Sequence, residues 1–373
     1  MTDLDGIRRE ALPLDRPEDL DPLLDRIGEA RFVLIGEASH GTHDFYAWRD
    51  ALTRRLIAEK GFGLVAVEGD WPDCERVNRA VTGDADPFQA LYAFMRWPAF
   101  MWANEEVALF CRWLRSWNAG RPPGARCGFH GLDVYSLRDS LRAVRRYAAA
   151  HLPAELDAVM DALHCFESFG HDPQRYAAAA VRLVPESCEE EVVGLLSAVL
   201  RAAPRDLAVR QNAEVVAGAE RYYRAMVRGG PDAWNVRLAG ERHGGDAVLV
   251  GFGGHRGSVV AGDRWGGRHH VMPVPPARPG SLEALLHEAL PDRPRALFVV
   301  PDGPRPGWYD ERLDHRAIGV VYRPDRERWD NYVPTETGRR YDAFLWLDRT
   351  TALHPLHGEP WGDTEPETYP SAV

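Results

Sequence analysis

Acidic and imidazole side chains follow three short apolar runs of this sequence, at the points where the runs end. The runs end at Ile35, Val67 and His130, and they are followed by Glu37 and His40, by Glu68 and by Asp133. A histidine held between carboxylates is a general base whose tautomer is fixed by its acidic partner. The same four side chains are also of the types that hold a divalent metal. The pattern therefore favours a hydrolytic site or a metal site.

A β–α–β unit over residues 31–68 is expected to position the first of these groups. Arg31–Ile35 is predicted to be a strand and Thr42–Lys60 a helix, because apolar residues recur there at intervals of three and four. Gly61 and Gly63 end the helix, and the second strand follows at Leu64. Such a unit implies parallel neighbouring strands, whose carboxyl ends are where ligands bind. We therefore expect Glu37 and Glu68 on adjacent strands.

The remaining pattern predicts an α/β fold with a mainly parallel sheet flanked by helices, and with a helical insert or cap region. Three parts are expected: residues 1–135 as the first part of the core, 136–230 as the helical insert, and 231–373 as the second part of the core. The first contains a lead-in helix, helices at 71–81 and 104–117, and a third strand at 126–130. The last contains strands at 247–253, 296–300, 317–322 and 343–347.

Composition excludes several classes of function. The chain has 373 residues and a net charge of -11, which disfavours a nucleic-acid or anionic-membrane surface. There is no secretory signal at the N-terminus and no apolar run long enough to cross a bilayer. The five cysteines are scattered without a CxxC pair, so we expect reduced thiols in a cytoplasmic protein, and neither a zinc nor a disulfide framework.

Further residues carry weaker signals. Arg49 in the first helix is placed either to pair with Glu68, to hold an anionic intermediate, or simply to face solvent. Ser39 beside His40 is not a convincing nucleophile, because the chain has no Gly-x-Ser-x-Gly elbow. The glycine-rich run 251–257 follows a strand and is either a phosphate-binding loop, although it lacks the P-loop Lys-Ser/Thr and a fitting GxGxxG, or a segment whose His255 or Arg256 faces the cleft. Aromatic side chains either line an apolar substrate surface or belong to the core: Trp97, Phe100, Trp102 and Tyr135.

Several motifs together resemble the erythromycin esterase family. The first is Gly36-Glu37-Ala38-Ser39-His40-Gly41-Thr42-His43, and the second is Val67-Glu68-Gly69-Asp70-Trp71. The similarity continues at residues 101–106 (Met-Trp-Ala-Asn-Glu-Glu), 131–136 (Gly-Leu-Asp-Val-Tyr-Ser) and 341–350 (Tyr-Asp-Ala-Phe-Leu-Trp-Leu-Asp-Arg-Thr). The resemblance covers most of the chain.

The resemblance implies an α/β core with a helical region beside it, and hydrolysis of an ester or macrolactone, as in macrolide inactivation. It implies activated water instead of a covalent serine, with no cofactor and no obligatory metal. Carried over by motif, His40 is the general base, and Glu37, Arg49 and Glu68 complete the catalytic set. Asp133, Trp102, Tyr135 and His255 are expected to bind the small-molecule substrate. The oligomeric state is left open.

The sequence departs from the family pattern at one place. The family carries a strand with an Ala-His-Asn-x-x-His-like motif, which supplies another active-site histidine, before the strand at 247–253. Here residues 234–237 run almost directly into 238–243, which indicates an internal deletion near Arg237-Leu238. A parallel sheet that loses an internal strand must pair again or leave a gap. Two alternatives to the hydrolase therefore stand: a degenerate, non-catalytic ligand-binding relative, and a metallohydrolase using Glu37, His40, Glu68 and Asp133.

Overall fold

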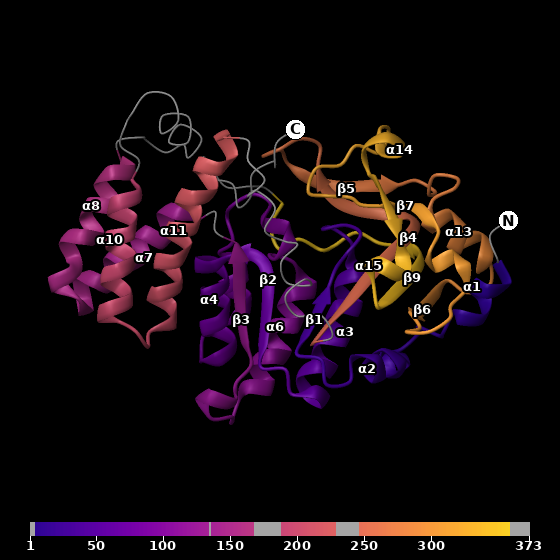
Figure 1. Cartoon of the computed structure of the whole chain (residues 1–373), viewed down its shortest axis with the longest axis horizontal. Coiled ribbons are helices and arrows are strands. Elements are labelled where there is room, and N and C mark those ends of the chain that lie inside the picture. Colours follow the sequence, from indigo (N-terminus) through magenta and orange to yellow (C-terminus); the bar gives the residue numbers. More distant parts are fainter. Residues whose placement is uncertain (1–3, 134–135, 168–187, 229–245, 359–373) are drawn as a thin grey trace. The chain divides into compact units, whose positions relative to one another are not determined.

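The computed structural model describes residues 4–133, 136–167, 188–228 and 246–358 (Figure 1). The chain divides into two compact units. The first consists of Met1–Phe62, Ala103–Phe110 and Arg237–Pro360, and the second of Gly63–Trp102, Cys111–Val236 and Trp361–Val373. Helix α6 (Glu105–Asn118) has its first turns in the first unit and its remainder in the second.

The first unit is built on a five-stranded sheet. Its central strand β4 (Ala247–Gly262) is parallel to β1 (Phe32–Ile35) on one side and to β9 (Ala343–Thr350) on the other. Strand β6 (Arg295–Val299) runs antiparallel to β9, and β5 (His269–Val274) runs antiparallel to the second half of β4. Strand β4 therefore has a parallel neighbour on each side, and β1 is an edge strand among the described strands.

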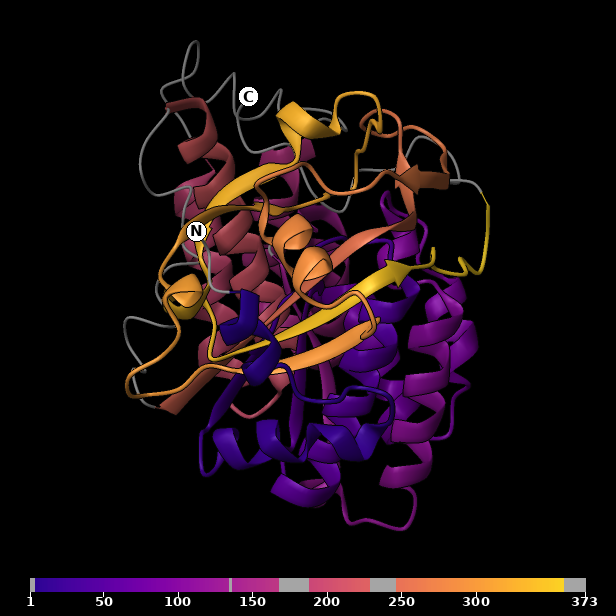
Figure 2. The ribbon, with the colours of Figure 1, turned by 90° about the vertical axis from the view of Figure 1, so that its right-hand side faces the viewer.

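Helices cover both faces of this sheet (Figure 2). Alternate residues of a strand point to opposite faces, and in β9 Phe344 and Trp346 pack with α1 (Leu4–Glu10) and α13 (Leu282–Ala289). Leu345 and Leu347 pack instead with η1 (Pro17–Leu20), α2 (Asp21–Ile27) and α3 (His43–Lys60). Both faces of the strand are apolar, as is typical of a sheet with helices on each side.

A small antiparallel ladder completes the first unit. Strands β7 (Arg312–Arg316) and β8 (Tyr332–Glu336) pair with each other. Short helices accompany this ladder: η8 (Gly307–Tyr309), α14 (Glu327–Asp330) and α15 (Thr337–Arg340).

The second unit has a two-stranded parallel ladder and a helical bundle. Strand β2 (Leu64–Asp70) pairs with β3 (Gly128–Asp133), and α4 (Trp71–Thr82) packs on β3. Helices α5 (Pro87–Tyr92), η2 (Ala99–Met101) and η3 (Pro123–Ala125) are short connections. The bundle, in magenta to salmon in Figure 1, contains α7 (Leu137–His151), η4 (Pro153–Glu155), α8 (Leu156–Glu167), α10 (Glu189–Ala202) and α11 (Leu207–Arg228).

The structure confirms the α/β class and most of the predicted elements. Helix α3 begins one residue after the predicted start, with Thr42 as its N-cap, and ends as predicted at Lys60. Its C-cap is Gly61, whose φ of 73° is left-handed. In the described part of residues 136–226, only helices occur, as predicted. Strands β4 and β9 are both longer than expected, and they continue to Gly262 and Thr350.

Three expectations about strands are wrong. Among the described residues, strands β1 and β2 do not pair with each other: β1 pairs with β4, and β2 pairs with β3. Residues 317–322 do not form a strand; they make isolated bridges at Ile318 and Val321, and the ladder strand ends at Arg316. Strands β2 and β3 extend to Asp70 and Asp133, so that Glu68 and Asp133 lie inside their strands instead of in the following turns.

The expectation that all five cysteines are reduced is also wrong. The structure joins Cys165 in α8 to Cys188 by a disulfide, whereas Cys74, Cys111 and Cys127 are free and buried. The sequence alone could not show this pair, because its members are separated by 23 positions and meet only when α8 and α10 pack together. Of the helices that the structure describes, none combines the length and the apolar character needed to cross a bilayer.

Candidate active site

The turn from Gly36 to Gly41 follows β1 and is fastened at both ends by backbone hydrogen bonds. Gly36 N donates to the carbonyl oxygen of Val250 at 2.9 Å, and Gly41 O accepts from Val260 N at 2.9 Å. Ile318 N donates to Ala38 O at 2.8 Å in the middle of the turn. Two segments that are distant in sequence, strand β4 and the chain around Ile318, therefore fix the backbone that carries Glu37 and His40.

Glu37, His40 and Arg49 come together at this turn. His40 Nδ1 lies 2.5 Å from Glu37 Oε1, and Arg49, from the second turn of α3, donates to Glu37 Oε2. The Glu37 side chain is 15% exposed, and the guanidinium carbon of Arg49 also lies 4.7 Å from the centre of the Tyr46 ring. Both oxygens of the carboxylate are therefore occupied, which fixes its orientation. The structure thus pairs Arg49 with Glu37.

The surroundings of Glu37 favour its ionised form. Burial, which is the largest influence, acts to raise the pKa of Glu37, but the charges of Arg49 and His40 and their hydrogen bonds outweigh it and hold the pKa below its usual value. An ionised carboxylate accepts a hydrogen bond and cannot donate one. Nδ1 of His40 is therefore the protonated ring nitrogen in this contact, and Nε2 is the nitrogen with the base lone pair when the ring is neutral.

Glu68 and Asp133 lie in the second unit, and the charge of Glu68 acts on Asp133. Burial, and next the negative charge of Glu68, raise the pKa of Asp133 to about 7. Trp102 is 4% exposed and therefore belongs to the core. Its indole N–H donates to the backbone oxygen of Glu68 at 2.7 Å, which anchors strand β2 to this core residue. Trp97 and Phe100 are buried as well, which favours the core alternative for these aromatic residues. Tyr135 lies outside the described residues.

The glycine-rich run 251–257 is part of strand β4 and pairs with β9, so it is not a phosphate loop. Its glycines allow close packing: a β-carbon at Gly253 would stand 2.6 Å from the Phe344 ring. His255 is 6% exposed and stacks on His287 with ring centres 3.8 Å apart. Burial, and next the charge of His287, lower the pKa of His255 to about 4, which keeps its ring neutral. Ser39 Oγ is buried and hydrogen-bonded to the Thr42 hydroxyl.

Sequence reasoning missed two polar clusters. In the second unit, Arg96 is 7% exposed and lies 2.8 Å from Asp70 and 2.9 Å from Asp73. In the first unit, Glu106 contacts the imidazoles of His43 and His354. His43 and Glu106 stand in motifs that the resemblance rests on, but His354 lies 248 positions from Glu106, and only the fold brings them together.

The fold and the turn define an α/β protein with a carboxylate-oriented imidazole at the end of a sheet strand. The family model described as erythromycin esterase matches residues 57–239 and 237–350, which is most of the chain. The protein belongs to the erythromycin esterase family. The match is in two segments that meet at residues 237–239, which is where the sequence predicts a deletion. The junction itself lies outside the described residues.

Individual relatives are distant. The erythromycin esterase type II of Escherichia coli is 28% identical over 122 residues, which span 33% of this chain and 28% of that relative's length. A solved succinoglycan biosynthesis protein is similar with a TM-score of 0.75 at 18% identity, covering 95% of this chain and 98% of the other. A mutant of the erythromycin esterase EreC in its open conformation has a TM-score of 0.62 at 16% identity, covering 92% and 97%. These structures confirm the fold.

β1 is an edge strand, and β2 pairs only with β3 among the described strands. Apolar side chains of these strands are exposed: Phe32 and Leu34 by 39% each, and Leu64 by 58%.

Proposed function

We propose that this protein hydrolyses an ester or lactone bond with water that is activated by His40. The geometry of Glu37, His40 and Arg49 carries the proposal. Nδ1 of His40 is hydrogen-bonded to the ionised carboxylate of Glu37, whose side chain is largely buried, and both residues follow the carboxyl end of a sheet strand. Membership of the erythromycin esterase family supports a hydrolase with a small-molecule substrate. Macrolide inactivation in the cytoplasm is the particular form of the reaction that we propose.

In the proposed reaction, Nε2 of His40 removes a proton from water while the water oxygen attacks the carbonyl carbon. The carbon–oxygen bond to the alcohol then breaks, and the alkoxide takes the proton back from the imidazolium. Glu37 keeps Nδ1 protonated and stabilises the imidazolium that forms, because an adjacent carboxylate favours the charged ring. No covalent intermediate is needed, which agrees with the buried, hydrogen-bonded hydroxyl of Ser39.

Arg49 acts in this proposal as a positioning residue. Its guanidinium occupies Glu37 Oε2 and leaves Oε1 for His40. If Arg49 only orients the carboxylate, Arg49→Lys should lower kcat with little change in KM, because the imidazole would be less well aligned while substrate contacts remain. The catalytic role predicted for Glu68, and the substrate-binding roles predicted for Asp133, Trp102, Tyr135 and His255, stay predictions.

The test is hydrolysis of macrolides and of simple lactones, followed by mass spectrometry for products that have gained one water. We expect wild type to produce such a product and His40→Ala to lose at least about 100-fold in rate, the usual contribution of a general base. His270→Ala is the matched control, because His270 is an exposed histidine of the same unit. Turnover that survives in His40→Ala, or the absence of any hydrolysed substrate, would overturn the proposal.

A second function is favoured by one observation, the break in the family match at residues 237–239. A relative that lacks the second histidine motif would bind a ligand of the same class without cleaving it. Equilibrium dialysis of wild type with the same macrolides and lactones distinguishes the two functions. Saturable binding without any hydrolysed product would support the binding protein, and turnover that depends on His40 would exclude it.

A further inference from the structure

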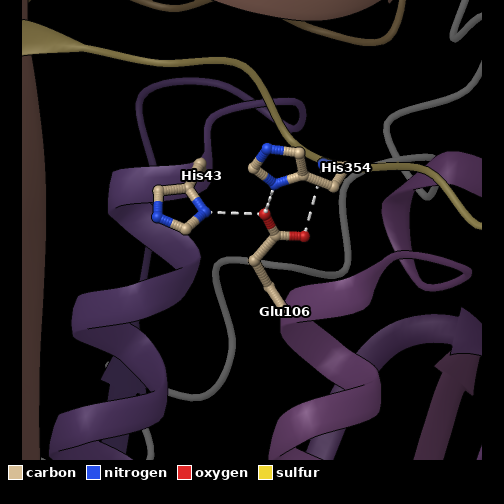
Figure 3. Close-up of side chains that lie close together, drawn as sticks. All are labelled: His43, Glu106 and His354. Atoms are coloured by element: carbon tan, nitrogen blue, oxygen red, sulfur yellow. Dashed lines mark hydrogen bonds and ion pairs between the residues drawn. The ribbon is translucent and has the colours of Figure 1, made fainter.

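Three metal-binding side chains meet where three segments of the first unit converge (Figure 3). His43 is the first residue of α3, Glu106 is the second residue of α6, and His354 lies in the segment that follows β9. One potential ligand atom from each of them lies within 4.8 Å of the others. Among the residues that the structure describes, no other group of three or more His, Cys, Asp or Glu side chains has its potential ligand atoms this close together.

The geometry is centred on one carboxylate oxygen. Glu106 Oε1 lies 2.6 Å from His43 Nδ1 and 2.7 Å from His354 Nδ1. Figure 3 shows that both rings point a nitrogen, Nδ1 in each case, toward this oxygen. The ring centres are 5.4 Å apart, at an interplanar angle of 81°. The rings therefore approach the carboxylate from different directions, as ligands around one ion do, instead of stacking on each other.

Backbone hydrogen bonds hold all three segments in place. His43 N donates to Thr351 O at 2.9 Å, and Glu105 N donates to His354 O at 2.9 Å. Leu356 N donates to Ala103 O at 2.8 Å, so the segment carrying His354 is fastened on both sides of the histidine. A site whose ligands are fixed by the scaffold needs little reorganisation when it binds an ion.

Burial and charge favour a cation at this place. The Glu106 side chain is 6% exposed, whereas His43 is 38% and His354 59% exposed, so an ion can reach the nitrogens from solvent. A buried carboxylate is costly unless a positive charge compensates it. Two neutral imidazoles and one carboxylate form the donor set that zinc and similar divalent ions take in proteins, with water in the remaining position.

The alternative is a cluster held by hydrogen bonds alone. A tetrahedral zinc ion places neighbouring ligand atoms roughly 3.3 Å apart, since its bonds to nitrogen and oxygen are about 2.0 to 2.2 Å. The present nitrogen–oxygen distances of 2.6 and 2.7 Å are those of protonated contacts. Replacing the bridging protons by an ion requires each ring to withdraw by about half an ångström, and the exposure of both rings leaves room for that movement.

We propose that His43, Glu106 and His354 bind one divalent transition-metal ion, for which Zn²⁺ is the best match. The ion would join the starts of α3 and α6 to the segment after β9. It would lie close in sequence to the turn that carries His40, three positions before His43. The site is separate from the Glu37, His40, Glu68 and Asp133 set considered from the sequence, and it does not depend on the proposed hydrolysis.

The test uses the whole chain without a histidine tag, stripped with a chelator and then titrated with Co²⁺ and with Zn²⁺. We expect one Co²⁺ per chain, with visible absorption bands of the bound ion, and a melting temperature that rises with the free metal concentration. His354→Gln and Glu106→Gln should each weaken binding at least about tenfold, because loss of even an outer partner of a metal ligand costs that much.

The matched control is His287→Gln, since His287 Nδ1 also lies 2.5 Å from a carboxylate, that of Asp348, but has no third ligand among the residues that the structure describes. His287→Gln and His40→Ala should bind the ion as wild type does. Circular dichroism and melting without metal show whether each variant folds. Equal binding by His354→Gln, Glu106→Gln and the control, or no stoichiometric binding by wild type, would overturn the proposal and leave a hydrogen-bonded cluster.

Discussion

The backbone of Gly41 lies against that of Val260 so closely that a β-carbon at Gly41 would stand 1.8 Å from the Val260 carbonyl oxygen. The Val260 N–H in turn donates to Gly41 O at 2.9 Å. The turn that carries Glu37 and His40 is therefore seated on strand β4, and no side chain fits at its end. The glycine after the histidine in the first motif is explained by this contact.

Gly41→Ala is expected to displace the turn from β4, because the overlap with the Val260 backbone cannot be relieved by a side-chain rotation. We expect a loss of about 2 to 3 kcal/mol in the free energy of unfolding and loss of any His40-dependent hydrolysis. Urea unfolding and the product assay measure the two effects. Gly319→Ala is the control, because a β-carbon there would meet nothing within 4 Å. Equal stability of the two variants would contradict the expectation.

The local sequence pattern was enough to predict structural features that depend on residues close together in the sequence. The spacing of Phe45, Trp48, Leu52 and Leu56 predicted helix α3, and these side chains do form the face that packs on the sheet. The pairing of Glu37 with His40 was also within reach, because three positions along one turn bring them together. Sequence reasoning succeeded where the contact is local.

Contacts between distant segments could not be predicted in this way. The partner of β1 is β4, more than 200 positions away, and nothing in residues 32–35 selects it over β2. The disulfide could not be predicted for the same reason. Nor could the contact between His354 and Glu106, which joins a loop to the start of a helix. Strand partners and side-chain clusters are set by the packing of the whole sheet.

Glu37→Gln should reduce stability in a pH-dependent way. The pKa of Glu37 is lowered in the folded chain, so its stabilising contribution is complete above the unfolded value of 4.5 and is lost as pH falls through the folded pKa. We expect wild type to be more stable than the variant by about 1 to 3 kcal/mol at pH 7, and the difference to shrink below pH 4.5. Urea unfolding across this range, with exposed Glu288→Gln as control, measures it. A pH-independent difference would refute the assignment.

Asp133→Asn should stabilise the protein increasingly as pH rises above about 4, with the full effect above pH 7. Asp133 has an unfolded pKa of 3.8 and a folded pKa of about 7, so folding is penalised increasingly as pH rises between these values. At 1.36 kcal/mol per pKa unit the penalty is at most about 4 kcal/mol, and partial exposure should leave about 1 to 2 kcal/mol. Thermal melts at pH 8 and pH 4 test this prediction. Stabilisation at both pH values, or at neither, would contradict it.

Glu68→Gln provides a second readout of the same pair. The charge of Glu68 is the second cause of the raised pKa of Asp133, after burial. Its removal should therefore stabilise at pH 8 by less than Asp133→Asn does. Because the two groups interact, the double variant should gain less than the sum of the single gains. Additive gains would show that the carboxyl groups do not influence each other.

The disulfide between Cys165 and Cys188 makes a chemical prediction. Alkylation in denaturant without reductant should modify Cys74, Cys111 and Cys127 and leave Cys165 and Cys188 linked, which peptide mass spectrometry detects. In the native protein Cys127 should react slowly, because burial raises the pKa of its thiol to about 11. The bond closes a loop with a sequence separation of 23, so its removal should cost about 2 to 4 kcal/mol.

Cys165→Ser measures that cost, since it opens the loop with a nearly isosteric side chain at the helix α8 end of the bond. Reductant should destabilise wild type by the same amount and leave the variant unchanged, because the variant has no bond to reduce. This comparison separates loss of the cross-link from a packing defect at the serine. Alkylation of all five cysteines in the non-reduced protein would show that the two thiols are only neighbours, and reductant would then have no effect on wild type.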